Sequence, residues 1–130
     1  MAELTGIKTF YKPKNKEDIK KNIHMFLENN DLKPQDIDLV ITGKNGDLKN
    51  DAVYNNITLP WGSTANYKHL CGEYPTSVAF ALWLAVNVIK QGNIPAIIAE
   101  GEIKVPSLKK VLIYNHYQNN YHSLMLLSAC

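Results

Sequence analysis

The sequence predicts an α/β domain in which helices cover a mixed β-sheet. A C-terminal antiparallel hairpin is expected to form the edge of this sheet. Strand-like and helix-like segments alternate along the 130 residues, an order that builds a sheet between helices. Residues 37–41 form a short, nearly continuous apolar run, which is typical of a strand covered on both faces. Residues 110–114 and 123–128 are β-rich runs around a polar connector, as in a hairpin with a longer loop. The length fits a single domain, 1–130.

The N-terminal part predicts a strand followed by an amphipathic helix. Residues Leu4–Tyr11 carry β-branched and aromatic side chains in weak alternation, and Pro13 ends the run. Asn15 lies three residues before Asp18, as a helix N-cap with an acidic first turn does. The cluster at 29–31 is expected to end this helix. Its apolar stripe consists of Ile19, Ile23, Phe26 and Leu27.

The middle of the chain predicts less regular structure. Gly43–Asp47 is a loop by composition, and Asn50–Ile57 is expected to form a short helix. An irregular stretch through Pro60, Gly62 and Asn66 is expected to follow.

The segment Thr76–Lys90 predicts a second helix with hardly a polar face. A helix that is apolar all round is expected to be buried all round. Thr76 is the expected N-cap, and Gly92 with Pro95 is expected to end the helix.

Composition is that of an ordinary globular domain, with 45% hydrophobic residues, 20% charged residues and a net charge of +2. The lysines of 12–21 alternate with acidic residues, which predicts a solvated helix face rather than a nucleic-acid interface. The longest apolar run, Val78–Val86, is too short to span a bilayer, and no N-terminal segment reads as a secretory signal. Two cysteines, Cys71 and Cys130, make no disulfide framework, so the cytoplasm is the expected location.

Two segments resemble the motif regions of β-ketoacyl synthases. Asp36–Asp51 is similar to the family's strand that runs into His-Gly-Thr-x-Thr-x-x-x-Asp. Tyr67–Ala79 is similar to Lys-x-x-x-Gly-His at the start of a helix, with Lys68 and Gly72 matching. The resemblance covers nearly the whole chain. It implies the C-terminal half of a thiolase-fold ketosynthase-like protein, whose nucleophilic cysteine belongs to the other half.

Three features of the family's site are missing. Gly43 and Glu73 stand where the two histidines would be, and His116–Asn120 replaces the turn Phe-Gly-x-Gly-Gly. The histidines stabilise negative charge on a malonyl thioester, whereas a carboxylate would repel it. No catalytic residue is therefore expected in this chain. The degenerate site positions are Gly43, Lys68, Glu73 and Tyr117, the last of which is expected to fill the pocket.

Several charged residues near these positions have structural interpretations. Lys68 could hold a buried carboxylate or form an architectural ion pair with Glu73, and the second needs no chemistry. Lys44 is expected to face solvent from its loop, and Asp51 is expected to anchor a helix start.

Cys71 is the possible nucleophile. It lies before the second helix, where a helix N-terminus can lower the pKa of a thiol, and Glu73 with His69, His116 or His122 could act as the base. A cysteine there is more often a small core residue. His69, Cys71 and Glu73 have a spacing that suits a strand rather than a loop, so no metal site is expected, and no cofactor.

The resemblance implies a non-catalytic subunit of the chain-length-factor type in fatty-acid or polyketide biosynthesis. Its partners would be an active ketosynthase and an acyl carrier protein, in a homo- or hetero-oligomer without nucleic acid. Two alternatives stay open. One is a thiolase-superfamily acyltransferase that uses Cys71 or Glu73 together with another half. The other is a stand-alone interaction module, in which a partner or a second copy covers the face left by the absent half.

Overall fold

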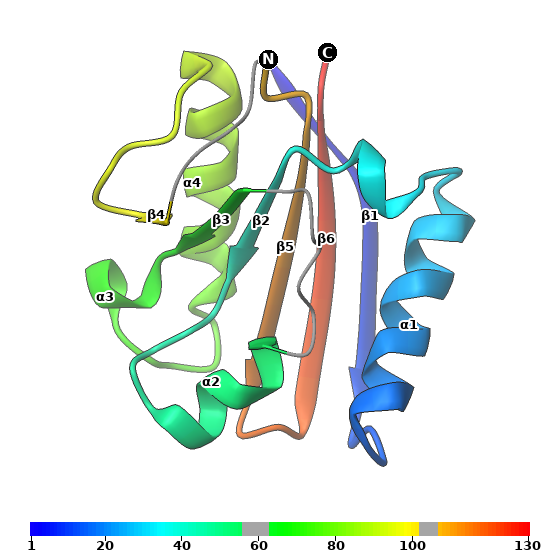
Figure 1. Ribbon diagram of the computed structural model, residues 1–130. Helices are drawn as coiled ribbons and strands as arrows, with labels where there is room; N and C mark the ends of the chain where they lie inside the picture. The colour runs from blue at the N-terminus through cyan, green and yellow to red at the C-terminus, as the bar shows by residue number, and fades with distance from the viewer. Residues whose placement is uncertain (56–62, 102–106) are drawn as a thin grey trace.

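The computed structural model describes residues 1–55, 63–101 and 107–130. A six-stranded mixed sheet in the order β1-β6-β5-β2-β3-β4 forms its centre (Figure 1). Strands β2, β3 and β5 are parallel to one another, whereas β1, β4 and β6 run antiparallel to their neighbours. The α/β class, the mixed sheet and the C-terminal hairpin are therefore confirmed. The prediction that the hairpin edges the sheet is wrong, because β1 pairs with β6 on its outer side. The elements are β1 (Ala2–Tyr11), α1 (Lys16–Asn29), the 3-10 helix η1 (Pro34–Asp36), β2 (Leu39–Thr42), α2 (Leu48–Asn55), β3 (Ser63–Asn66), α3 (Lys68–Cys71), α4 (Val78–Gln91), β4 (Ala99–Glu100), β5 (Lys110–Tyr117) and β6 (Tyr121–Ala129).

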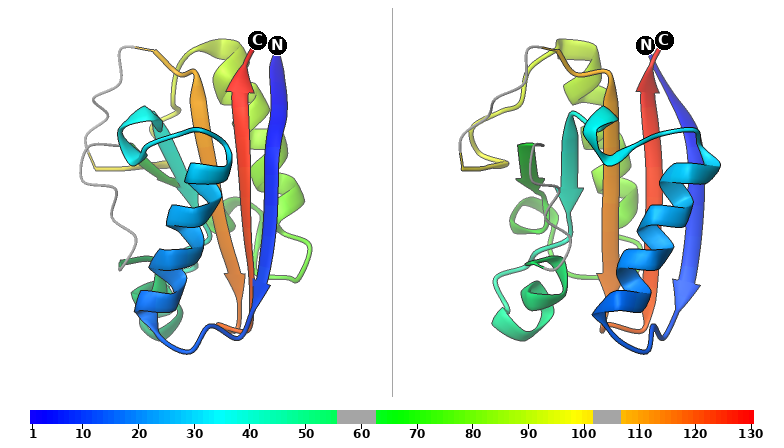
Figure 2. Two further views of the ribbon diagram at one scale, coloured as in Figure 1. Left: turned by 90° about the vertical axis from the view of Figure 1, so that its right-hand side faces the viewer. Right: turned by 45° about the vertical axis from the view of Figure 1, so that its right-hand side comes forward.

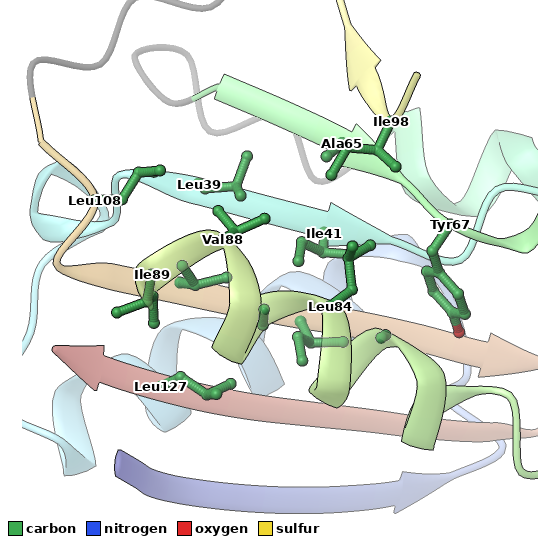
Figure 3. Packing of buried hydrophobic residues seen from close by; sticks show 14 residues of the cluster. Leu39, Ile41, Ala65, Tyr67, Leu84, Val88, Ile89, Ile98, Leu108 and Leu127 are labelled. Carbon is green, nitrogen blue, oxygen red and sulfur yellow. The ribbon is translucent and has the colours of Figure 1, made fainter. Parts of the chain in front are cut away.

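Helices α1 and α4 lie on opposite faces of the sheet (Figure 2). Alternation along β2 divides the core between them, since Leu39 and Ile41 pack with α4 whereas Val40 packs with α1. Figure 3 shows Leu84 and Val88 of α4 on the same side of the sheet as Leu39 and Ile41 of β2. Among the described helices, none is long and apolar enough to cross a membrane.

Helix α1 follows its local sequence signals. The Asn15 side chain accepts a hydrogen bond of 2.9 Å from the backbone N–H of Asp18, which confirms the predicted cap. The four residues of the predicted stripe are the buried ones of the helix: Ile19, Ile23, Phe26 and Leu27.

Helix α4 differs from its prediction in two ways. It is not buried all round, because it covers the sheet with one face and leaves the other uncovered, where Trp83 is 59% exposed and Val86 36%. The N-cap is Ser77 rather than Thr76, and its hydroxyl makes no capping bond but lies 3.3 Å from the Tyr67 hydroxyl. The predicted end is confirmed, with Gly92 in the left-handed conformation at φ 72°.

The stretch predicted to be irregular contains a strand. Strand β3 pairs with β2 and β4, although its sequence Ser-Thr-Ala-Asn lacks the usual apolar pattern. Pairing on both sides therefore stabilises a conformation that the local sequence does not favour. Helix α2 begins at Leu48, two residues before its predicted start, because the Asp47 carboxylate caps the N–H groups of Lys49 and Asn50. Its predicted end, Ile57, and the predicted irregular positions Pro60 and Gly62 lie outside the described residues.

The hairpin turn is shorter than predicted. Tyr117 pairs with Tyr121, so only Gln118–Asn120 connect β5 and β6. Gln118 and Asn119 both have positive φ, at 53° and 54°. Asparagine adopts this left-handed conformation more readily than most residues, and the turn persists without the glycines of the family pattern.

Candidate functional site

A pocket of about 170 Å³ lies where the carboxyl ends of the parallel strands β2 and β5 meet. Side chains that follow such strands gather at one edge of the sheet, which is where α/β folds place their sites. All four positions singled out from the sequence line this pocket. The lining residues are Gly43, Asn45, Asn50, Lys68, Glu73, His116, Tyr117 and Gln118.

Lys68 and Glu73 form an ion pair at one wall of the pocket. The Lys68 Nζ atom lies 2.6 Å from Glu73 Oε2, and the Asn45 side chain donates to the same oxygen at 2.9 Å. The Lys68 side chain is 2% exposed, whereas that of Glu73 is 34% exposed. The carboxylate thus neutralises a buried ammonium group while remaining in contact with water. Glu73 is already engaged by two donors, so it is poorly placed to act as a base.

The different exposure of the two charges predicts an asymmetric response to mutation. Glu73→Gln leaves the buried Lys68 ammonium without a counter-charge and should lower the free energy of unfolding by about 2 kcal/mol. This is less than the cost of breaking a fully buried pair, because water reaches Glu73. Lys68→Met leaves only a carboxylate that water can solvate, and it should cost about 1 kcal/mol. Urea denaturation of both variants checks the order, and Lys68→Met/Glu73→Gln should be more stable than Glu73→Gln alone. A larger loss in Lys68→Met would contradict this account.

Gly43 is surrounded by the side chains of a buried polar network. A Cβ atom at this position would collide with Asn115 Oδ1 and the Tyr54 hydroxyl oxygen, and it would lie 3.1 Å from Lys68 Cε. The Tyr54 hydroxyl accepts from the His116 N–H at 2.9 Å, and Tyr67 donates to Asn115 Oδ1 at 3.1 Å. The space in which a histidine side chain would begin is therefore filled.

Tyr54, Tyr67 and Asn115 are the site residues that the sequence interpretation missed. Burial raises the pKa of both tyrosines, so their hydroxyls stay protonated and serve as hydrogen-bond donors. The available sequence signal was Gly43 itself, since a missing side chain after a buried strand leaves room for others. The sequence gives no indication of which residues fill that room.

His116 is the imidazole in the pocket wall, and both of its ring nitrogens are engaged. Nε2 donates to the Asn50 carbonyl at 2.9 Å, and Nδ1 accepts from the Asn119 N–H at 3.1 Å. These partners fix the neutral tautomer with its proton on Nε2, and burial also lowers the His116 pKa. The ring has a structural role, which is to tie the hairpin turn to α2.

Lys44 and Asp51 both make contacts that fix the loop between β2 and α2. Lys44 is not solvent-facing, since its side chain is 20% exposed and pairs with Glu100 at 2.8 Å. Asp51 lies in the first turn of α2, as predicted for a residue that anchors a helix start. Its carboxylate accepts from the N–H groups of Asn45 and Gly46, at 2.9 and 3.1 Å, and so holds the loop in place.

Cys71 does not line the pocket. It is half-buried, and its Sγ lies 3.5 Å from the Gly72 carbonyl oxygen. The His69 ring is bonded to the Ile97 carbonyl at 2.7 Å, and His122 is buried in the other half of the core, against Phe10. Neither is among the pocket residues. Within the described residues, no three His, Cys, Asp or Glu side chains gather as a metal site.

No protein-family model matches the chain, and no curated protein matches it in sequence. Solved structures do match. The ishigamide ketosynthase/chain length factor superposes with a TM-score of 0.81 at 14% identity, covering 99% of this chain and 38% of that one. AbyA1, a tetronic acid condensing enzyme, gives 0.63 at 12%, covering 98% and 48%. The 3-oxoacyl-[acyl-carrier-protein] synthase III of Aquifex aeolicus VF5 gives 0.59 at 13%, covering 98% and 45%.

These three structures share the thiolase fold. The chain matches them along almost all of its own length but spans less than half of each of theirs. The protein is therefore a thiolase-fold domain that corresponds to one part of a ketosynthase-sized chain.

Proposed function

We propose that this protein is a ketosynthase-like domain that has lost condensation chemistry and serves as a non-catalytic partner of an active ketosynthase. The observation that carries the proposal is the filled position at Gly43. Tyr54 and Asn115 occupy the space of a side chain there, and they are bonded to each other and to neighbouring backbone. The neighbouring residues thus occupy the space of the missing histidine side chain, so the site differs from the family pattern by more than a single substitution.

The charges of the pocket support the same conclusion. Decarboxylative condensation needs donors that stabilise an oxyanion, and the strongest candidate donor is the Lys68 ammonium. Glu73 lies 2.6 Å from it and would repel a developing negative charge. The one imidazole among the described pocket residues has both nitrogens engaged. Neither the Lys68 ammonium nor the His116 ring is thus free to act as the missing histidines would.

The partner role rests on the fold and on the printed name of one similar structure. The ishigamide protein is a ketosynthase/chain length factor, and it has the highest TM-score of the three structures described here. A chain that keeps this fold but fills the side-chain space at Gly43 is suited to shaping a neighbouring cavity or a complex. On this proposal an active ketosynthase and an acyl carrier protein are its partners.

The purified protein is expected neither to decarboxylate nor to condense malonyl thioesters in the absence of a partner. Release of CO₂ from malonyl-acyl carrier protein is the direct measurement, with an active ketosynthase as the positive control. Release of CO₂ by the protein alone would contradict the proposal. A second assay tests the partner role, in which the protein should co-purify with a co-expressed ketosynthase and change the chain length of its products.

The acyltransferase that uses Cys71 has less support. Cys71 is absent from the pocket lining, its thiol is bonded to the Gly72 carbonyl, and Glu73 accepts from Asn45 and Lys68. On the present geometry the two residues do not form a nucleophile and its base.

A further inference from the structure

An amine, an amide and a carboxylate meet at one atom in the wall of the pocket. The Lys68 Nζ and the Asn45 Nδ2 both donate to Glu73 Oε2, at 2.6 and 2.9 Å. Two nitrogen atoms that share one acceptor atom lie next to each other, and Cγ of Asn45 is bonded directly to one of them. Lys68 begins α3 whereas Asn45 belongs to the loop before α2, so the fold places the amide carbon close to the amine.

The Asn45 amide is held in place by hydrogen bonds. Its Oδ1 accepts from the Asp47 backbone N–H at 2.9 Å, and its own backbone N–H donates to Asp51 Oδ1 at 2.9 Å. A donor on a carbonyl oxygen stabilises the negative charge that develops there when a nucleophile attacks the carbon. A fixed reactant beside a nucleophile also reacts with a much lower entropic cost than a free one. The Asn45 amide is therefore oriented for attack at Cγ.

Lys68 supplies the nucleophile, and Glu73 supplies the acceptor for its proton. The Lys68 side chain is buried, and Glu73 is the only hydrogen-bond partner of its Nζ among the described residues. Burial removes the water that would otherwise surround the amine. The ammonium group must lose a proton before it can attack, and the carboxylate that can take it lies at hydrogen-bond distance. Glu73 is not free for a ligand, but here the proton moves between the two groups that already hold it.

We propose that Lys68 and Asn45 form an intramolecular isopeptide bond, with Glu73 as the proton relay. The Lys68 Nζ attacks Asn45 Cγ, so that an Nζ–Cγ bond forms and the Cγ–Nδ2 bond breaks. Glu73 accepts a proton from the ammonium group and then protonates the leaving nitrogen. The second proton that Nζ loses departs with the ammonia as an ammonium ion. Glu73 ends the reaction as the carboxylate with which it began, and nothing is oxidised or reduced.

A second set of the same residue types provides an internal comparison. Lys44 Nζ donates to Glu100 Oε1 at 2.8 Å, and Asn66 Nδ2 donates to Glu100 Oε2 at 3.2 Å. These two donors bond to different oxygen atoms, whereas the donors of the first set share one. The Lys44 side chain is also 20% exposed, compared with 2% for Lys68. We therefore expect the bond at Lys68 and none at Lys44.

Intact-mass spectrometry of the purified protein, before and after incubation at neutral pH, tests the proposal. Because water reaches Glu73, the reaction should be slow, and a species lighter by about 17 Da, the mass of one ammonia, should accumulate over a week. Trypsin cannot cleave after a lysine that is part of an amide bond. It should therefore release residues 45–49 joined to residues 50–90. Lys68→Arg and Glu73→Gln should each keep the sequence mass.

Lys44→Arg is the matched control and should lose ammonia as the wild type does. Circular dichroism verifies folding, and Asn45→Ala, in an exposed loop, replaces Lys68→Arg if that variant fails to fold. Wild-type protein that keeps its sequence mass would overturn the proposal. So would a loss that persists in Lys68→Arg, because the Gly46 nitrogen would then have attacked Asn45 to form a succinimide.

A Glu73→Gln variant that reacts as fast as the wild type would overturn the relay. The inference does not depend on the proposed function, since the mass measurement reads neither catalysis nor ketosynthase binding. Neither Lys68→Met nor Glu73→Gln can form the bond by this route, so the order of their stabilities is independent of it.

Discussion

Gly43→Ala should lower the free energy of unfolding by about 3 kcal/mol, a large effect for the addition of one methyl group. The new Cβ would overlap Asn115 Oδ1 and the Tyr54 hydroxyl, both of which are buried and hydrogen-bonded. To make room, these side chains must move and lose bonds worth about 1 kcal/mol each, in addition to the cost of overpacking. Urea or thermal denaturation measures the loss.

Gly46→Ala in the same loop is the matched control. A Cβ there meets no atom within 4 Å, but the residue has φ +91°, so the expected cost is backbone strain of about 1 kcal/mol. The crowding is tested separately in a Tyr54→Phe background, where Gly43→Ala should cost less than in the wild type. Equal costs for both glycine substitutions would show that the network does yield to a side chain. Gly43→His would then become a credible way to restore an imidazole, which the present geometry opposes.

Local signals predicted some elements of this fold well. The cap and apolar stripe of α1 depend on contacts within a few residues, and each predicted residue lies where expected. Helix α4 was identified by its composition, but its burial was not, because burial depends on what lies beyond the sheet layer. Strand β3 has a polar sequence and exists through its pairing with β2 and β4, which no local pattern records.

The candidate site was likewise predicted only in part, since local patterns do not record contacts between distant residues. Comparison with the motif pattern identified Gly43, Lys68, Glu73 and Tyr117 as one site, and the fold does bring them to one pocket. The network under Gly43 was not predicted, because its bonds join Asn115 to residues 61 and 48 positions away. Contacts at such separation are set by how β2, α2 and β5 come together. The sequence shows that the histidine is absent, but only the structure shows that Tyr54 and Asn115 occupy the space of its side chain.

Stability should fall by about 3 kcal/mol as the pH drops from 6.5 to 4, owing to His122. Its ring is buried between Phe10, Tyr114 and His116, and its Nε2 has no hydrogen-bond partner in the described structure. Its pKa is lowered from 6.5 to about 4, mainly by desolvation on burial and to a smaller extent by neighbouring His116, against an opposing effect of the Asn119 backbone. The folded protein therefore resists protonation in a range where the unfolded chain accepts a proton. The stability is fully present above pH 6.5 and is lost as the pH falls toward 4.

About 2 kcal/mol of this loss should occur between pH 7 and pH 5, above the range in which most carboxylates titrate. Urea denaturation at these two pH values measures it. His122→Phe keeps a ring stacked on Phe10 but cannot be protonated, so it should remove most of the difference, with His116 supplying the remainder in the same direction. His24→Gln, on the exposed face of α1, is the control and should keep the wild-type difference. An unchanged pH dependence in His122→Phe would mean that the buried imidazole is not the group that sets the acid limit of this fold.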